Sequence, residues 1–169
     1  IGAQIAEAVL AHRPKLEKSA VRARVIELLE LVGIDRAQER MALYPHSFSG
    51  GMRQRVALAR ALVVDSEILL MDEPFSALDK QTSNCLREEL QRIWMETKKT
   101  ILFITHSAEE AVYLADRVVV LTPECGMVSE ILPISLERPR HVYDPAFVEL
   151  RHSILDAVQG ATNRENKEM

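Results

Sequence analysis

Apolar residues recur at helical spacing through most of the first 64 positions. The clearest case is the stretch 21–32, where valines and leucines return every three or four residues. Ser19 is a typical N-cap for this helix and Gly33 a typical stop signal. The same pattern predicts further helices at residues 1–10, 36–43 and 49–64, with Pro45 ending the second of these.

Beyond this helical third, short apolar runs alternate with amphipathic stretches. Ser107 and Glu110 form a capping box at the start of one predicted helix. The tail from Gly160 is polar and is predicted to be disordered. Strands are predicted at residues 67–71, 100–105, 117–121 and 127–132, and helices at 82–96, 107–115 and 145–159.

Strands that alternate with helices indicate an α/β fold with a mostly parallel sheet. The short apolar runs read as strands buried on both faces. The change in composition along the chain predicts three parts: a helical subdomain at 1–64, a sheet-bearing core at 65–135, and a linker, helix and tail at 136–169.

Composition narrows the classes of function. The formal net charge is -4 and no basic block occurs, which argues against nucleic acid as the main partner. No apolar run approaches the roughly 18–20 residues of a membrane span. Cys85 and Cys125 stand in unrelated contexts, so two small half-buried thiols in a reducing cytosol are expected, without a disulfide or zinc site.

Three short motifs carry candidate chemistry. Ser49-Gly50-Gly51 opens a helix, where free N–H groups and the helix dipole favour an anion by roughly 0.3–1 kcal/mol. Asp72-Glu73 follows a predicted strand at the sheet edge where α/β proteins bind ligands. One of these carboxylates suits Mg²⁺ held through water, and the other suits polarising an attacking water.

His106 follows the next predicted strand, and an imidazole at that edge can donate to a phosphate oxygen. Each motif taken alone also fits a structural role. The serine and glycines fit an ordinary N-cap with a flexible entry, the acidic pair fits a solvated strand end, and the histidine fits a satisfied structural side chain.

Together the motifs point to one family. Residues 44–79 read YPHSFSGGMRQRVALARALVVDSEILLMDEPFSALD, which closely resembles the ATPases of ABC transporters: signature loop, helix, Walker B strand, catalytic glutamate and a loop ending in Asp79. His106, within FITHSAEEA, falls where that family has its switch histidine. The resemblance covers roughly residues 1–159. It implies part of a P-loop NTPase (RecA-like) core with an ABC helical subdomain.

The resemblance implies a role for each motif. Ser49, Gly50 and Gly51 would contact the γ-phosphate of ATP held by a second ATPase subunit, and Asp79 would reach across that dimer interface. Asp72 would bind Mg²⁺, Glu73 would act on the hydrolytic water, and His106 would hold the γ-phosphate. Met52 stands where the family more often has Gln.

One element of the family is missing from this sequence. A phosphate loop reads G-x-x-x-x-G-K-[ST], and no glycine here is followed by lysine. Because the chain also opens at Ile1 without a methionine, we expect a fragment of a longer protein. We further expect that the chain alone binds ATP weakly without hydrolysing it, and that part of its apolar sheet surface is uncovered.

Two importer groups share features with this chain. The segments EEAVYLADRVVVL (109–121), LERPRH and DPAFVELRHSIL (144–155) look like nitrate, sulfonate and taurine importer ATPases, whereas IGAQIAEAVL and MALYPHSFSGGMRQR (41–55) look more like peptide importer ATPases. The first group is favoured. Either implies a dimeric motor bound to a transmembrane permease at the cytoplasmic face of the membrane.

Two other readings of the family remain. A non-transport ABC ATPase would carry coiled-coil insertions, zinc modules or a second cassette, none of which is visible in the sequence. A degenerate regulatory protein would have no chemical reason to keep Asp72, Glu73, Asp79 and His106 together.

Overall fold

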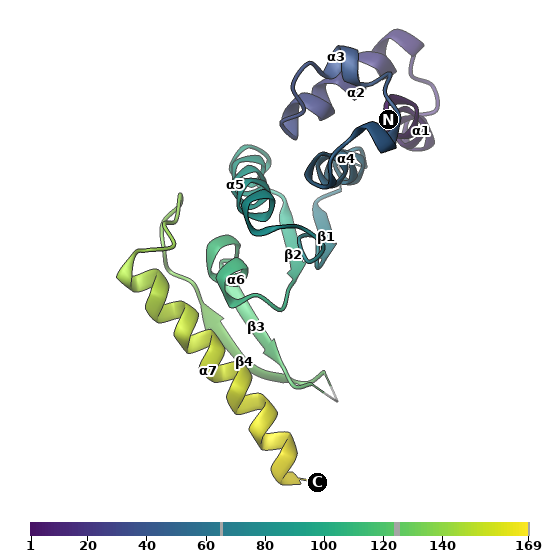
Figure 1. Cartoon of the computed structure of the whole chain (residues 1–169). Coiled ribbons are helices and arrows are strands. Elements are labelled where there is room, and N and C mark those ends of the chain that lie inside the picture. Colours follow the sequence, from purple (N-terminus) through teal and green to yellow (C-terminus); the bar gives the residue numbers. More distant parts are fainter. Residues whose placement is uncertain (65, 124–125, 169) are drawn as a thin grey trace. The chain divides into compact units, whose positions relative to one another are not determined.

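The computed structural model describes residues 1–64, 66–123 and 126–168, and the chain divides into two compact units, Ile1–Phe103 and Ile104–Met169. Figure 1 labels the elements of both units. The first contains α1 (Gly2–His12), α2 (Lys18–Leu31), α3 (Ala37–Arg40), the 3-10 turn η1 (Pro45–Ser47), α4 (Gly50–Leu62), β1 (Ile68–Asp72) and α5 (Lys80–Thr97). β2 (Thr100–Ile104) spans the division, and α6 (Ala108–Leu114), β3 (Arg117–Leu121), β4 (Val128–Pro133) and α7 (Pro145–Glu168) follow.

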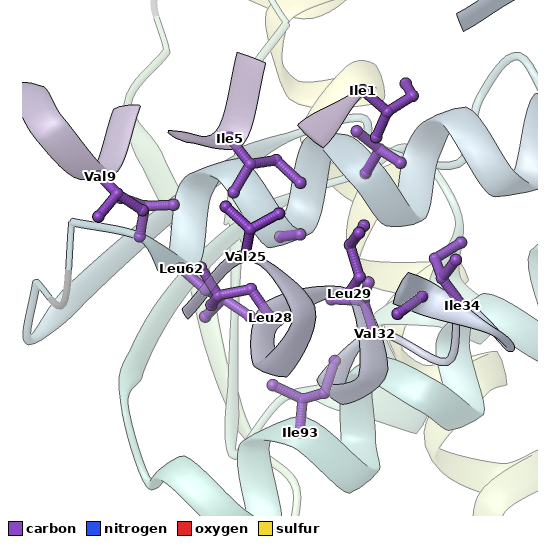
Figure 2. Packing of buried hydrophobic residues seen from close by; sticks show 14 of the residues in the cluster. Ile1, Ile5, Val9, Val25, Leu28, Leu29, Val32, Ile34, Leu62 and Ile93 are labelled. Atoms are coloured by element: carbon purple, nitrogen blue, oxygen red, sulfur yellow. The ribbon is translucent and has the colours of Figure 1, made fainter. Parts of the chain in front are cut away.

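The first unit is built on an apolar cluster between α1, α2 and α4. The regular spacing of valines and leucines on α2 turns Val25, Leu28 and Leu29 inward, where all three are fully buried. Ile5 and Val9 of α1 meet them from the other side (Figure 2). This packing confirms the helical reading of the first 64 residues.

Two arginines close the C-terminal end of α2. Gly33 adopts φ +69°, and the amide of Ile34 donates to Leu29 O, which ends the helix where the sequence predicted. Arg55 of α4 donates to Val32 O at 2.7 Å, and Arg92 of α5 donates to Leu31 O. Three helices therefore meet at the carbonyl end of α2, which favours positive charge.

The start of α2 differs from the prediction. The helix begins at Lys18 with Glu17 as its N-cap, and Glu17 O accepts the first helical hydrogen bond from Val21. Ser19 therefore lies inside the first turn, so its prediction as the cap was wrong.

The strands form two pairs with different geometry. β1 and β2 are hydrogen-bonded neighbours joined through the helix α5, and their arrows in Figure 1 point the same way. A helical crossover joins parallel strands, and a parallel pair is what the alternation of strands and helices predicts. β3 and β4 instead pair antiparallel, with Val119 opposite Ile131, because the short connection between them permits only a hairpin.

Alternate apolar side chains of these strands are exposed. On β1, Ile68 and Leu70 are 63% and 64% exposed while Leu69 between them is buried, and on β2 Leu102 is 59% exposed. The strands were predicted to be buried on both faces; in the described chain only one face of β1 is buried. The uncovered apolar sheet surface expected from the sequence is therefore present.

The second unit has a smaller core beneath α7. Phe147 of α7 is fully buried and meets Tyr113 of α6 edge to face, with ring centroids 6.5 Å apart. Val112, Ile134 and Ile154 complete this cluster. This cluster joins α6 and α7 to the β3–β4 hairpin, so together they form one compact unit.

Three smaller findings complete the fold. α7 continues to Glu168, so the predicted disorder from Gly160 was wrong. The helix continues because one glycine costs it only about 1 kcal/mol, and the alanine, arginine, glutamate and lysine beyond Gly160 are good helix formers.

Cys85 is a free, exposed thiol and not half-buried, and Cys125 lies outside the described residues. No helix in the described part of the chain is both long and apolar enough to cross a membrane.

Candidate functional site

Ser49, Gly50 and Gly51 lie at the start of α4, as the sequence predicted. Ser49 is the N-cap, and its hydroxyl oxygen accepts a hydrogen bond from the amide of Met52 at 3.3 Å. Ser49 and Gly50 are exposed, whereas Gly51 is buried. The first N–H groups of a helix have no partner within it, so this exposed turn can present them to an anion.

Asp79 caps the next helix, α5. Its Oδ1 accepts from the amide of Thr82 at 2.9 Å and its Oδ2 accepts from the Thr82 hydroxyl at 2.7 Å. Bonds from the Thr82 hydroxyl and then the Thr82 amide hold the pKa of the Asp79 carboxyl below its ordinary value. The helix was predicted to begin at residue 82, and it begins at Lys80 because Asp79 serves as its cap.

The structure brings these two helix starts together. A Cβ atom built on Gly51 would lie 2.4 Å from Cγ2 of Thr82, a distance that real Cβ atoms essentially never show. A Cβ on Gly50 would lie 3.5 Å from Cδ2 of Leu78, which is ordinary contact. The glycine turn therefore packs on the loop that ends in Asp79, and a side chain at position 51 would require Thr82 to shift. Four of the predicted site residues form one group.

Asp72 and Glu73 lie at the end of β1, and both are exposed. Glu73 has φ +41°, a conformation that is unusual for a residue with a side chain and more so before a proline. The turn that follows holds this conformation, since the amide and the hydroxyl of Ser76 both donate to Glu73 O, at 3.3 and 3.0 Å. Backbone strain of this kind costs of order 1–3 kcal/mol and concentrates at functional sites.

An aromatic contact anchors the same loop. Phe75 is buried and its ring lies 5.6 Å from the ring of Phe103 on β2. The segment from Glu73 to Asp79 is thus held near its start by the contact between Phe75 and Phe103 of β2, and at its end by Asp79, which caps α5.

His106 belongs to the second unit and lies between β2 and α6, with its side chain exposed. Its two neighbours are linked to each other and to Glu110 by hydrogen bonds. The Thr105 hydroxyl donates to Glu110 Oε2 at 2.6 Å, and the amide of Ser107 donates to Thr105 Oγ1 at 3.0 Å. Ser107 Oγ accepts from the amide of Glu110 at 3.3 Å, so the predicted serine cap is present, although Glu110 reaches Thr105.

The far end of α6 is held by Arg140, which the sequence analysis did not identify. This arginine is 4% exposed, and its Nη1 donates to the carbonyls of Val112, Tyr113 and Ala115 at 2.6, 3.2 and 2.7 Å. Burial first, and then the nearby charge of Arg138, lower the pKa of Arg140 to about 10. Arg140 is 25 residues beyond Ala115 in the sequence, so no local signal could have suggested this contact.

No group of three His, Cys, Asp or Glu side chains gathers to hold a metal ion among residues 1–64, 66–123 and 126–168. An exposed carboxylate at a strand end nevertheless suits Mg²⁺, which usually keeps several waters and needs only one or two protein carboxylates beside substrate phosphates. Asp72 meets that description.

Comparison with known proteins agrees with this geometry. Residues 3–76 match the family described as ABC transporter. The nitrate import ATP-binding protein of Synechococcus elongatus is 48% identical over 90% of this chain and 56% of its own length. The aliphatic sulfonates import ATP-binding protein of Bacillus licheniformis is 44% identical over 83% of this chain and 54% of its own length. The chain spans about half the length of these curated relatives.

A solved structure agrees as well. The dimeric structure of a post-hydrolysis state of an ATP-binding cassette, bound to ADP and Pi, is 28% identical to this chain with a TM-score of 0.61. The similarity covers 77% of this chain and 54% of that one.

Proposed function

Because residues 3–76 match the ABC transporter family and the curated relatives are importer ATP-binding proteins, we propose that the chain is the signature-bearing part of the nucleotide-binding subunit of an ATP-driven importer. One observation carries the proposal: the Ser49–Gly51 turn and the Asp79 loop pack against each other at the starts of α4 and α5. The glycine-opened start of α4 presents free N–H groups suited to a phosphate, and the Asp79 loop packs beside it.

The residues divide into two functional groups. Ser49, Gly50 and Gly51 bind the γ-phosphate of ATP through backbone and hydroxyl groups, and Asp79 lies beside them at the interface with a second subunit. Asp72 would hold Mg²⁺, which would neutralise phosphate charge. Glu73 orients and polarises the hydrolytic water, and His106 donates to the γ-phosphate.

The phosphate-loop lysine lies outside this sequence. No glycine in the chain is followed by lysine, so the lysine that helps neutralise the phosphates must come from residues other than these, in the rest of the subunit or in a second subunit. The similar cassette of known structure is a dimer, which supports a second ATPase subunit as the partner. A transmembrane permease would be the other partner, with the ATPase on the cytoplasmic face of the membrane.

The solute is proposed from the relatives alone. The two curated relatives are named for import of nitrate and of aliphatic sulfonates, both small oxyanions. We place this chain with importers of that group. Its own residues do not touch the solute in this proposal, because their chemistry is directed at phosphate and water.

Hydrogen exchange followed by mass spectrometry tests the proposal on the chain as it is. We expect Mg·ATP to slow amide exchange in segment 49–53 with an affinity in the millimolar range, because the main phosphate cradle is lacking. AMP, which has no triphosphate, should give no protection. Ser49→Ala should weaken the effect, whereas Ser47→Ala, an exposed serine in η1, should not. Protection that is equal for AMP and ATP, or absent with ATP, would overturn the assignment.

Turnover is a separate measurement. The chain alone is expected to release no phosphate from ATP above the buffer rate. ATP turnover that disappears in Glu73→Gln would show that the chain is a complete catalyst and that the second subunit is not required.

A further inference from the structure

Thr82 stands between two residues that the proposed function assigns to the same nucleotide site. It lies in the first turn of α5 and is half-buried. Its Cγ2 methyl occupies the space next to Gly51 that any side chain at position 51 would need. Of the two glycine contacts with this loop, only the one between Gly51 and Thr82 is tight. The contact between Gly50 and Leu78 has an ordinary van der Waals distance.

The other branch of Thr82 is fixed by Asp79. The hydroxyl donates to Asp79 Oδ2 at 2.7 Å while the amide of the same residue donates to Oδ1 at 2.9 Å. Both oxygens of one carboxylate are therefore engaged by one residue. A threonine in a helix divides between two χ1 rotamers according to the hydrogen bond its hydroxyl makes, so the bond to Asp79 selects the rotamer that directs the methyl at Gly51.

We propose that Thr82 is a positioning residue that couples the engagement of Asp79 to the packing of Gly51. When a group on a partner subunit draws the Asp79 carboxylate away, the Thr82 hydroxyl loses its acceptor and the methyl is no longer held against the glycine turn. Binding at Asp79 and binding at the Ser49–Gly51 turn then influence each other through one side chain, and this influence is reciprocal. The coupling itself is within the chain, but its consequence for nucleotide binding rests on the proposed function.

Two conservative substitutions separate the branches of Thr82. Thr82→Val keeps a methyl beside Gly51 and removes the hydroxyl that binds Asp79. Thr82→Ser keeps the hydroxyl and removes the methyl. Both retain a side chain of similar volume, so the fold is expected to persist, and a native circular dichroism spectrum checks this before each comparison.

The readout is amide exchange in segment 49–53 when Asp79→Asn is introduced into each background, without nucleotide. With Thr82 present we expect Asp79→Asn to speed exchange in this segment by about threefold or more, which corresponds to a coupling of the usual size between residues in contact. In Thr82→Val and in Thr82→Ser, the same substitution should leave the segment unchanged. Thr97→Ser, which alters a threonine at the far end of the same helix, should leave the full response intact.

The opposing result is equally clear. If Asp79 only caps α5, then Asp79→Asn speeds exchange in the first turn of α5 in every background and does not alter segment 49–53. That pattern, or an equal response of segment 49–53 in all three backgrounds, would overturn the coupling. Because no nucleotide is added, a failure here is distinct from a failure of Mg·ATP to protect the same segment.

Discussion

The two compact units are stabilised in different ways. In the first, the helices α1, α2 and α4 bury a broad apolar cluster that includes Ile5, Leu28 and Leu29. In the second, a few apolar side chains surround Phe147, and the buried guanidinium of Arg140 binds the carbonyl end of α6. A small core gains less free energy from apolar burial. A polar contact that satisfies several backbone carbonyls therefore provides a larger share of the stability of the second unit than it would in a unit with a large core.

The difference also bears on the candidate site. Ser49 begins a helix whose buried face is part of the large apolar cluster, so the glycine turn is supported by packing. His106 precedes α6, whose opposite end depends on Arg140. The comparison predicts that the second unit is the more sensitive of the two to the loss of a single polar side chain.

The largest effect is expected at the centre of the smaller core. Phe147→Ala should destabilise the second unit by about 3–5 kcal/mol, because it removes a fully buried ring and leaves a cavity. Hydrogen exchange of α6 amides measures the loss. Tyr143→Ala, at a side chain 91% exposed, should change the same exchange by less than about 0.5 kcal/mol. Similar effects of the two variants would mean that Phe147 is not the centre of this core.

A somewhat smaller effect is expected at the polar contact. Arg140→Met should cost the second unit about 2–3 kcal/mol, since it leaves buried carbonyls of α6 without their donor. Exchange of the last amides of α6 reports this directly. Arg151→Met is the matched control, because its 3.9 Å pair with Glu109 is partly exposed and is worth at most about 1 kcal/mol. An Arg140→Met variant as stable as the control would remove the distinction between the units.

Gly33, at the end of α2 in the first unit, and Gly126, between β3 and β4 in the second unit, form a matched pair of glycines. Gly33→Ala should cost about 1–3 kcal/mol, because φ is +69° and a Cβ would lie 2.2 Å from Nη1 of Arg55. Gly126 has a similar φ of +59° but open space around its Cβ position, so Gly126→Ala should cost only the backbone term, about 1 kcal/mol. Urea unfolding compares the two. Equal losses would show that the contact between Arg55 and the end of α2 contributes little.

The smallest effect concerns pH. The pKa of Asp79 is lowered in the folded chain by its bonds from Thr82, so the carboxylate contributes stability above its unfolded pKa of about 3.9. That contribution is lost as pH falls through the lower folded-state pKa. The difference in Tm between wild type and Asp79→Ala should therefore be constant above about pH 4 and narrow below it. Ser49→Ala removes a neutral cap, and its difference in Tm should not change over this range.

Several features followed from local sequence. The spacing of valines and leucines predicted α2, the residues 117–121 predicted β3 with its observed bounds, and Ser49 and Ser107 were identified as caps. These features depend on residues within one turn or one strand of each other, and for that reason they can be read from the chain directly. The likeness to ABC transporter ATPases rests on the same kind of local motif, and the comparisons confirmed it.

The sequence by itself therefore determined the likeness to ABC transporter ATPases, most of the elements and the residue types of the candidate site. Only the tertiary structure decided that the Thr82 methyl lies against Gly51, that Arg140 binds the end of α6, and that Ile68 and Leu70 of β1 are exposed. Each of these depends on residues that are distant in the chain, or on which face of a strand is covered. Such contacts are set by how whole elements pack, and no local pattern encodes that packing.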